Sequence, residues 1–131
     1  MPRFIDNNDG TVFDTKTCLL WQQSDDGVRR NWYEAKEYAK AITLAGHSNW
    51  RLPTIEELTG IIDYKLWNPA CASLFTCRSN SYWSGSTFAA HPDYAWYVGF
   101  GNGYVGADAK GYANVYVRCV RAEKEPNKCQ S

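Results

Sequence analysis

Residues 50–58 read Trp-Arg-Leu-Pro-Thr-Ile-Glu-Glu-Leu, and they predict a short extended segment, a corner and a helix. Pro53 ends the segment before it, because its ring fixes φ and it has no N–H to donate. Thr54 is a good N-cap, and Glu57, three residues later, completes a capping box with it. Apolar residues then recur at helical spacing: Ile55, Leu58, Ile61 and Ile62.

Arg51 lies between two apolar residues, just before this corner. Its guanidinium could contact a ligand, but we favour a structural role in which it holds loop carbonyls or a carboxylate such as that of Glu57. Loss of one partner of a desolvated charge pair costs about 3–5 kcal/mol, so we expect Arg51→Ala to lower the melting temperature markedly. The structural set of this stretch is Trp50, Arg51, Leu52, Pro53, Thr54 and Glu57.

The composition predicts one aromatic-rich domain. The chain has 131 residues, of which 44% are apolar and 15% aromatic, with six Trp and nine Tyr. Aromatic side chains bury large areas and favour strands, and this length suits a single core. We therefore expect one domain over residues 1–122 and a polar tail over residues 123–131.

The charge balance and the hydropathy argue against two classes of partner. Lys and Arg together number 14, as do Asp and Glu, so the formal net charge is zero. A neutral chain lacks the basic surplus typical of nucleic-acid-binding domains, and no apolar run reaches the length of a membrane-spanning helix. We expect no nucleic-acid partner and no membrane insertion.

Five cysteines are many for a small cytosolic protein, and they indicate an oxidising compartment. An odd number leaves at least one thiol unpaired or intermolecular, and the pairing stays open. Residues 1–6 show no signal peptide. We therefore expect an extracellular or cell-surface domain whose signal or parent-chain segment is absent from this sequence. The disulfide candidates are Cys18, Cys71, Cys77, Cys119 and Cys129.

Short β-prone runs separated by turn residues predict a set of strands. These are residues 3–6, 11–13, 18–21, 82–84, 95–100, 104–105 and 114–120. The last run places Val115, Val117 and Cys119 on one face and Tyr116, Arg118 and Val120 on the other. Asn31 and Glu34 predict a second capped helix that stops near Gly46. Residues 65–81 read as a long irregular loop, which in a compact domain is usually tied down or functional. The fold class is therefore α+β.

The run Asn7-Asn8-Asp9-Gly10 has the composition of a calcium loop. The EF-hand pattern needs a carboxylate five residues before the glycine, and that position holds Ile5. We expect a plain turn here and no cofactor, with calcium as the less favoured alternative.

Short motifs along the chain occur in a characteristic order. They are Phe4-x-Asp6, Asp9-Gly10-Thr11-Val12, Leu20-Trp21-Gln22, Trp32-x-Glu34-Ala35, residues 45–54, Tyr82-Trp83-Ser84, Ala95-Trp96-Tyr97-Val98 and residues 117–121. In this order the chain resembles the Lcl C-terminal-like family (DUF1566) over about 120 residues. One departure is Cys18, where the family pattern leads us to expect Gly.

The resemblance implies a C-type-lectin-like fold, related to the formylglycine-generating (sulfatase-modifying) superfamily. Such folds pack two helices on small twisted antiparallel sheets and present long irregular loops. The resemblance also implies a bacterial secreted or surface protein, since the collagen-like adhesin for which the family is named binds sulfated glycosaminoglycans. We expect a non-enzymatic, adhesin-like domain that binds a glycan, including a sulfated polysaccharide, or a host or cell-surface protein. Tyr and Asn suit adaptable recognition surfaces, and the contact candidates are His91, Asp93, Tyr94, Asn102, Tyr104, Asp108, Lys110, Tyr112 and Asn114.

Two alternatives and one requirement remain. The domain could be an oligomerising tip, such as a trimer, or a receptor-binding module of a phage or diversity-generating element. It could also be an enzyme of the formylglycine-generating type, but Cys71 and Cys77 lie too early in the chain and Cys119 sits within a strand pattern. A sulfated ligand would need a basic surface assembled from scattered residues: Arg29, Arg30, Arg78, Lys110, Lys124 and Lys128.

Overall fold

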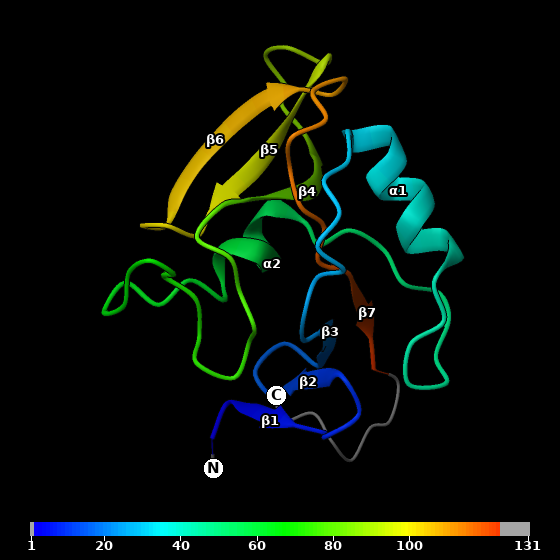
Figure 1. Cartoon of the computed structure of the whole chain (residues 1–131), viewed down its shortest axis with the longest axis vertical. Coiled ribbons are helices and arrows are strands. Elements are labelled where there is room, and N and C mark those ends of the chain that lie inside the picture. The colour runs from blue at the N-terminus through cyan, green and yellow to red at the C-terminus, as the bar shows by residue number, and fades with distance from the viewer. Residues whose placement is uncertain (1, 124–131) are drawn as a thin grey trace.

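The chain folds into two small antiparallel sheets and two helices (Figure 1), and the computed structural model describes residues 2–123. The first sheet has the strand order β1-β2-β3-β7 and contains Phe4–Asp6, Thr11–Asp14, Leu19–Gln22 and Val120–Ala122. The second sheet has the order β4-β5-β6 and contains Ser81–Thr87, Tyr94–Gly99 and Tyr104–Ala109. This arrangement confirms the predicted α+β class.

Both helices begin at the capping boxes that the sequence predicts. Helix α1 spans Trp32–Ala41, and the side chains of Asn31 and Glu34 each accept the backbone N–H of the other residue. Helix α2 spans Ile55–Thr59, with the same exchange between Thr54 and Glu57. Helix α1 ends before the predicted Gly46, because the chain turns extended at the C-cap, Ile42.

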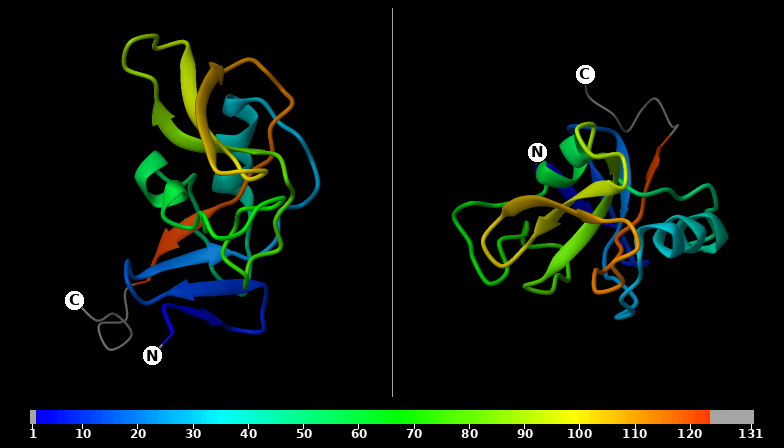
Figure 2. Two further views of the ribbon diagram at one scale, coloured as in Figure 1. Left: turned by 90° about the vertical axis from the view of Figure 1, so that its left-hand side faces the viewer. Right: turned by 90° about the horizontal axis from the view of Figure 1, so that it is seen from above.

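The two sheets lie at opposite ends of the molecule, and α1 covers one flank (Figures 1 and 2). Two clusters of buried side chains fill the space between these elements. The first cluster includes Trp21, Leu58, Ile61, Tyr82, Phe100 and Val120. The second cluster includes Trp32, Ala35, Ala39, Trp50, Leu52 and Trp83.

Residues 115–120 lie between the two clusters and contribute side chains to both. Their side chains alternate as predicted, with Val115, Val117 and Cys119 in the second cluster and Tyr116 and Val120 in the first. The predicted strand over residues 114–120 is nevertheless wrong, since β7 begins only at Val120. The reason is that the segment crosses between the sheets and changes its backbone partners, with bridges from Val115 to Arg30 and from Tyr116 to Tyr82.

The predicted irregular stretch lies between α2 and β4 and projects beside the β5–β6 turn (Figure 1). Backbone hydrogen bonds hold it along its length. The N–H groups of Asn68 and Ala70 donate to Gly101 and Phe100, both at 2.6 Å. Further along, Ala72 N–H donates to Ile61 at 3.0 Å. The loop is therefore tied to the body of the domain, as expected for a long loop in a compact fold.

Candidate functional site

The contact residues predicted from the sequence divide between the two ends of the β5–β6 hairpin. In the antiparallel register Tyr94 faces Ala109 and Gly99 faces Tyr104. Six paired residues at about 3.4 Å per residue separate the two ends by about 17 Å. Asn102 and Tyr104 lie at one end. His91, Asp93, Tyr94, Asp108 and Lys110 lie at the other end, and Tyr112 and Asn114 lie on the segment that follows it.

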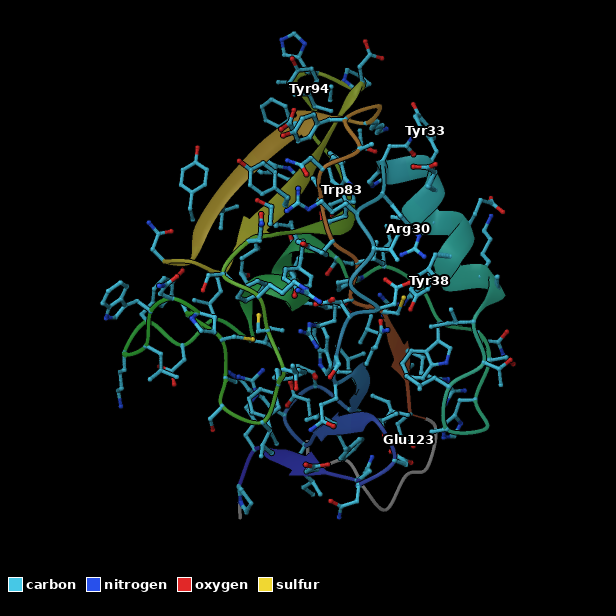
Figure 3. The ribbon with its side chains drawn as sticks, in the orientation of Figure 1. Arg30, Tyr33, Tyr38, Trp83, Tyr94 and Glu123 are labelled. Atoms are coloured by element: carbon cyan, nitrogen blue, oxygen red, sulfur yellow. The ribbon has the colours of Figure 1, made fainter. Side chains whose placement is uncertain are left out.

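The β4–β5 connection, which contains His91, is braced by ring contacts that extend to Tyr94 at the start of β5. Phe88 stacks on His91 with centroids 6.3 Å apart, and His91 lies 5.5 Å from Tyr94. Phe88 also packs edge-on against Trp96 at 4.8 Å. Figure 3 shows Tyr94 at this extremity of the molecule. These contacts give His91 and Tyr94 a structural role in shaping the tip of the connection.

Two of the predicted polar residues stabilise a neighbouring segment. The side-chain oxygen of Asn114 accepts a hydrogen bond from Arg29, and its amide nitrogen donates to the Tyr112 hydroxyl at 3.2 Å. Arg29 also donates to the Tyr116 hydroxyl at 3.1 Å. Asn114 and Tyr112 therefore hold the segment that leads into α1.

The opposite end of the hairpin carries three exposed rings, on the loop between α2 and β4 and at the start of β6, and we call this surface the aromatic edge. It consists of Tyr64, Trp67 and Tyr104, whose exposed fractions are 74%, 77% and 60%. An exposed cluster of large apolar side chains is unusual on a protein surface and marks interaction sites. Trp and Tyr are also the residue types that contribute most at binding surfaces.

The aromatic edge is assembled by close backbone contact between two loops. Asn68 N–H donates to Gly101 O at 2.6 Å, so the loop that carries Trp67 lies against the β5–β6 turn. Gly103 has φ +84°, and a Cβ there would lie 2.9 Å from Cε1 of Tyr64. Only glycine suits this position, since a side chain would both strain the backbone and push the Tyr64 ring away.

A local turn fixes the loop that displays Trp67. The side chain of Asp63 accepts from Lys65 N–H, and its carbonyl accepts from Leu66 N–H, both at 3.0 Å. Asp63 N–H donates to Ala70 O at 3.0 Å and closes the loop at its base. A braced loop loses little conformational entropy when a ligand binds.

Sequence reasoning missed Tyr64 and Trp67, because large apolar residues in an irregular stretch read equally well as core. The signal that could have found them is their position in Asp63-Tyr64-Lys65-Leu66-Trp67-Asn68-Pro69. Turn formers stand at both ends of this run, and it shows no strand or helix periodicity that would place its aromatic residues on a buried face.

A second surface feature lies between α1 and the residues before α2, and we call it the lysine groove. It is a cavity of about 200 Å³ lined by Lys36, Ala39, Lys40, Trp50, Arg51, Leu52 and Gly85. Of these, Ala39, Trp50 and Leu52 are apolar, whereas Lys36, Lys40 and Arg51 carry positive charges. The groove therefore combines an apolar floor with a basic rim.

The basic residues predicted for an anionic ligand are mostly engaged elsewhere. Arg30 pairs with Asp26 at 2.8 Å and lies over the Tyr38 ring, 4.0 Å from its centroid; Figure 3 labels Arg30 and Tyr38. Arg78 pairs with Asp25 at 3.0 Å. Burial alone would raise the pKa of Asp25, but hydrogen bonds from Tyr82 and Arg78 outweigh it and hold this pKa below its usual value. Lys124 and Lys128 lie outside the described residues.

The opening stretch has the structural contacts expected of it. Trp50 and Leu52 are buried, and backbone hydrogen bonds of 2.9 Å in both directions pair Arg51 with Val120. The Arg51 guanidinium donates to both carboxylate oxygens of Glu57, at 2.8 and 3.0 Å. The Arg51 side chain is 45% exposed, so the pair is less desolvated than the predicted cost assumed.

The cysteines differ in state and surroundings. Within the described residues Cys71, Cys77 and Cys119 are free thiols, whereas Cys18 is not among them. Cys129 and most of the predicted tail, residues 124–131, lie outside the described part of the chain. Burial raises the pKa of Cys119 to about 12, which suits a packing role.

Residues 2–123 contain neither a candidate metal cluster nor a helix that could span a membrane. Within this range we find no group of three or more His, Cys, Asp or Glu side chains placed to hold a metal ion. Within the same range neither helix combines the length and the apolar character needed to cross a membrane.

Comparison with known proteins gives one result on ancestry. No curated protein matches the chain in sequence. The family model described as the Lcl C-terminal domain matches residues 10–121. The matched range begins just before β2 and ends within β7, so it includes both helices, the second sheet, the aromatic edge and the first sheet except for β1 and the last residue of β7. The chain therefore belongs to the Lcl C-terminal domain family.

Proposed function

We propose that this chain is a non-enzymatic, adhesin-like binding domain that recognises a glycan through the aromatic edge. The observation that carries the proposal is the display of Tyr64, Trp67 and Tyr104 on two loops joined by backbone hydrogen bonds. Each ring leaves more than half of its surface in water, which costs free energy unless a partner covers it.

The chemistry of the aromatic edge suits a sugar. One face of a pyranose ring presents C–H groups that pack on an aromatic ring, while its hydroxyl groups need polar partners. Asn102 lies in the turn beside Tyr104 and supplies an amide. The Tyr97 ring lies 6.2 Å from that of Tyr104 and supports it from the sheet. A protein ligand, such as a host or cell-surface protein, could use the same rings, so the assay below includes both classes.

We extend the proposal to fold type and location. The two helices and two small antiparallel sheets support a C-type-lectin-like fold, with a relationship to the formylglycine-generating superfamily. In such a fold, loops of the C-terminal half carry the binding surface. A bacterial secreted or surface protein is the setting in which a glycan-binding domain of this family would act.

The test compares matched aromatic variants on a glycan array and by calorimetry. Trp67→Ala and Tyr104→Ala should each weaken binding at least about tenfold, because truncation of a hot-spot residue costs about 2 kcal/mol or more. Tyr33→Ala is the control, since Tyr33 is 57% exposed but lies on α1, away from the aromatic edge (Figure 3). Equal binding by Trp67→Ala and the parent would refute the assignment. Absence of any glycan or protein ligand at millimolar concentration would refute the function.

The lysine groove supports a second candidate, a sulfated polysaccharide bound by charge. Lys36 and Lys40 lie one helical turn apart on the same side of α1, with Arg51 across the groove. Exposed charge contacts are screened by salt, so affinity should fall steeply as the salt concentration rises. Lys36→Gln with Lys40→Gln should abolish the salt-dependent part of binding, and Lys16→Gln, in the turn between β2 and β3, is the matched control. Affinity that is insensitive to salt would exclude this candidate.

The alternative of an oligomerising tip or a phage-type receptor-binding module rests on the same exposed rings. Self-association would cover them in place of a glycan. Light scattering of the purified domain separates the two, because a trimer that dissociates on Trp67→Ala would assign the aromatic edge to assembly. A strict monomer would leave ligand binding as the role of this surface.

A further inference from the structure

Cys71 and Cys77 lie at the two ends of a short segment that folds back against the first hydrophobic cluster. Cys71 is 3% exposed and belongs to that cluster, and Cys77 packs against it with part of its surface open to solvent. Both are free thiols that face the same cluster, and each changes the pKa of the other through a side-chain hydrogen bond. The fold has therefore brought two thiols together, one sheltered and one reachable from water.

A buried positive charge lies beside this thiol pair. Arg118 is fully buried, and its guanidinium donates at 2.6 Å to the carbonyl of Thr76, the residue before Cys77. Its centre also lies 5.1 Å from the Phe75 ring and 5.3 Å from the Tyr82 ring.

The charge of Arg118 has no anionic partner in the described part of the chain. No carboxylate of residues 2–123 forms an ion pair with it, and its Nε donates no hydrogen bond there. A buried charge without a counter-ion is costly, and a thiolate at Cys77 would supply one.

We propose that Cys71 and Cys77 form a redox-active dithiol that small disulfides, such as oxidised glutathione, convert into an intramolecular disulfide. The Cys77 thiolate attacks one sulfur of oxidised glutathione, forms a mixed disulfide and releases one glutathione thiolate. Cys71 then loses its proton to solvent and attacks the Cys77 sulfur, which releases the second glutathione. The protein loses two electrons and two protons in total, and one disulfide is reduced to two thiols.

The electrostatics assign the order of attack. The hydrogen bond from Cys71 lowers the pKa of Cys77, burial opposes this, and the positive charge of Arg118 lowers it further. The same hydrogen bond and burial raise the pKa of Cys71. Because Cys77 is the thiol that solvent reaches and the thiolate is the nucleophile in thiol–disulfide exchange, Cys77 attacks first and Cys71 resolves.

The position of the pair links it to the aromatic edge. Cys71 follows Ala70, whose backbone closes the Trp67 loop at both Asp63 and Phe100. A disulfide from Cys71 to Cys77 would add a covalent bond next to the backbone hydrogen bonds that close the Trp67 loop.

The test treats the reduced full chain with oxidised glutathione, alkylates the remaining thiols and maps the tryptic peptides. Trypsin releases residues 66–78 as one peptide that contains both cysteines. We expect this peptide to lose two hydrogen atoms and to resist alkylation. In Cys71→Ser we expect glutathione to remain on Cys77, at a rate at least about tenfold above that of the buried Cys119. In Cys77→Ser, Cys71 should stay unmodified.

The parent chain decides the outcome without depending on a variant that fails to fold. Stable glutathione on Cys77 of the parent would show that Cys71 does not resolve, and would overturn the proposal. Alkylation of both cysteines after the oxidant would overturn it as well. Cys119→Ser is the control and should oxidise like the parent, and circular dichroism confirms that each variant is folded.

Discussion

Removal of the Arg51 guanidinium tests whether the stretch at residues 50–58 is held by an ion pair or reserved for a ligand. Arg51→Ala deletes two hydrogen bonds to Glu57, at 2.8 and 3.0 Å, and one to the Leu52 carbonyl at 3.2 Å. It leaves the capping box intact, because Glu57 still accepts from the backbone N–H of Thr54 at 2.8 Å. The substitution therefore isolates the charge pair from the helix cap.

The structure lowers the loss of stability that the sequence predicts for Arg51→Ala. A cost of about 3–5 kcal/mol applies to a desolvated pair, but the Arg51 side chain is 45% exposed and that of Glu57 is 21% exposed. Exposed ion pairs contribute about 0.2–1 kcal/mol, and bidentate geometry favours the upper end of this range. We expect a loss of about 1 kcal/mol, which corresponds to a melting temperature lower by about 3–5 °C for a chain of this length.

The pH dependence gives an independent signature of the pair. Burial alone would raise the pKa of Glu57, but hydrogen bonds from Arg51 and Thr54 outweigh it and lower this pKa. A carboxylate whose pKa is lower in the folded state stabilises the protein above its unfolded pKa of about 4.3. This contribution is lost as the pH falls through the folded pKa. The difference in the free energy of unfolding between the parent and Arg51→Ala should therefore have its full size at neutral pH and disappear below about pH 4.

Thermal and urea unfolding of the parent, Arg51→Ala, Glu57→Gln and the double variant measure this coupling. A double-mutant cycle should give about 1 kcal/mol at pH 7. Arg51→Lys should restore little, because a point charge cannot replace the planar fork. A variant that melts like the parent at every pH but no longer binds ligand would refute the reasoning. It would place Arg51 among the ligand-binding groups of the lysine groove.

Three further substitutions test other contacts. Asp14→Asn should cost about 3 kcal/mol in urea unfolding at pH 7, because its side chain is 1% exposed and pairs with Arg3 at 2.7 Å; an unchanged midpoint would contradict this. Asn31→Ala should cost about 1 kcal/mol through loss of the α1 cap, and Asn31→Asp should retain most of that stability. Gly106→Ala places a Cβ 2.8 Å from Cε2 of Tyr104, so it should shift the ring resonances of Tyr104 and weaken glycan binding, and unaltered resonances would contradict the contact.

Local signals in the sequence were sufficient for the helix starts and for the alternation of residues 115–120. Capping boxes act between residues three apart, so Asn31 and Thr54 can be identified as N-caps from the sequence alone. Side-chain alternation depends only on extended geometry. The predicted alternation was therefore confirmed although the predicted strand over residues 114–120 was wrong. The hydrogen-bonded strand failed because its partners, Arg30 and Tyr82, come from separate parts of the chain.

The sequence by itself determined the class of fold, the two caps and the membership that the ordered motifs indicate, because each depends on neighbouring residues or on their order. Only the tertiary structure decided which candidate residues share a surface. It separated Asn102 and Tyr104 from the other contact candidates by the length of a hairpin. It also brought Tyr64 and Trp67 beside Tyr104 through a backbone contact between two loops. Such contacts depend on where distant segments meet, and neither periodicity nor composition records that.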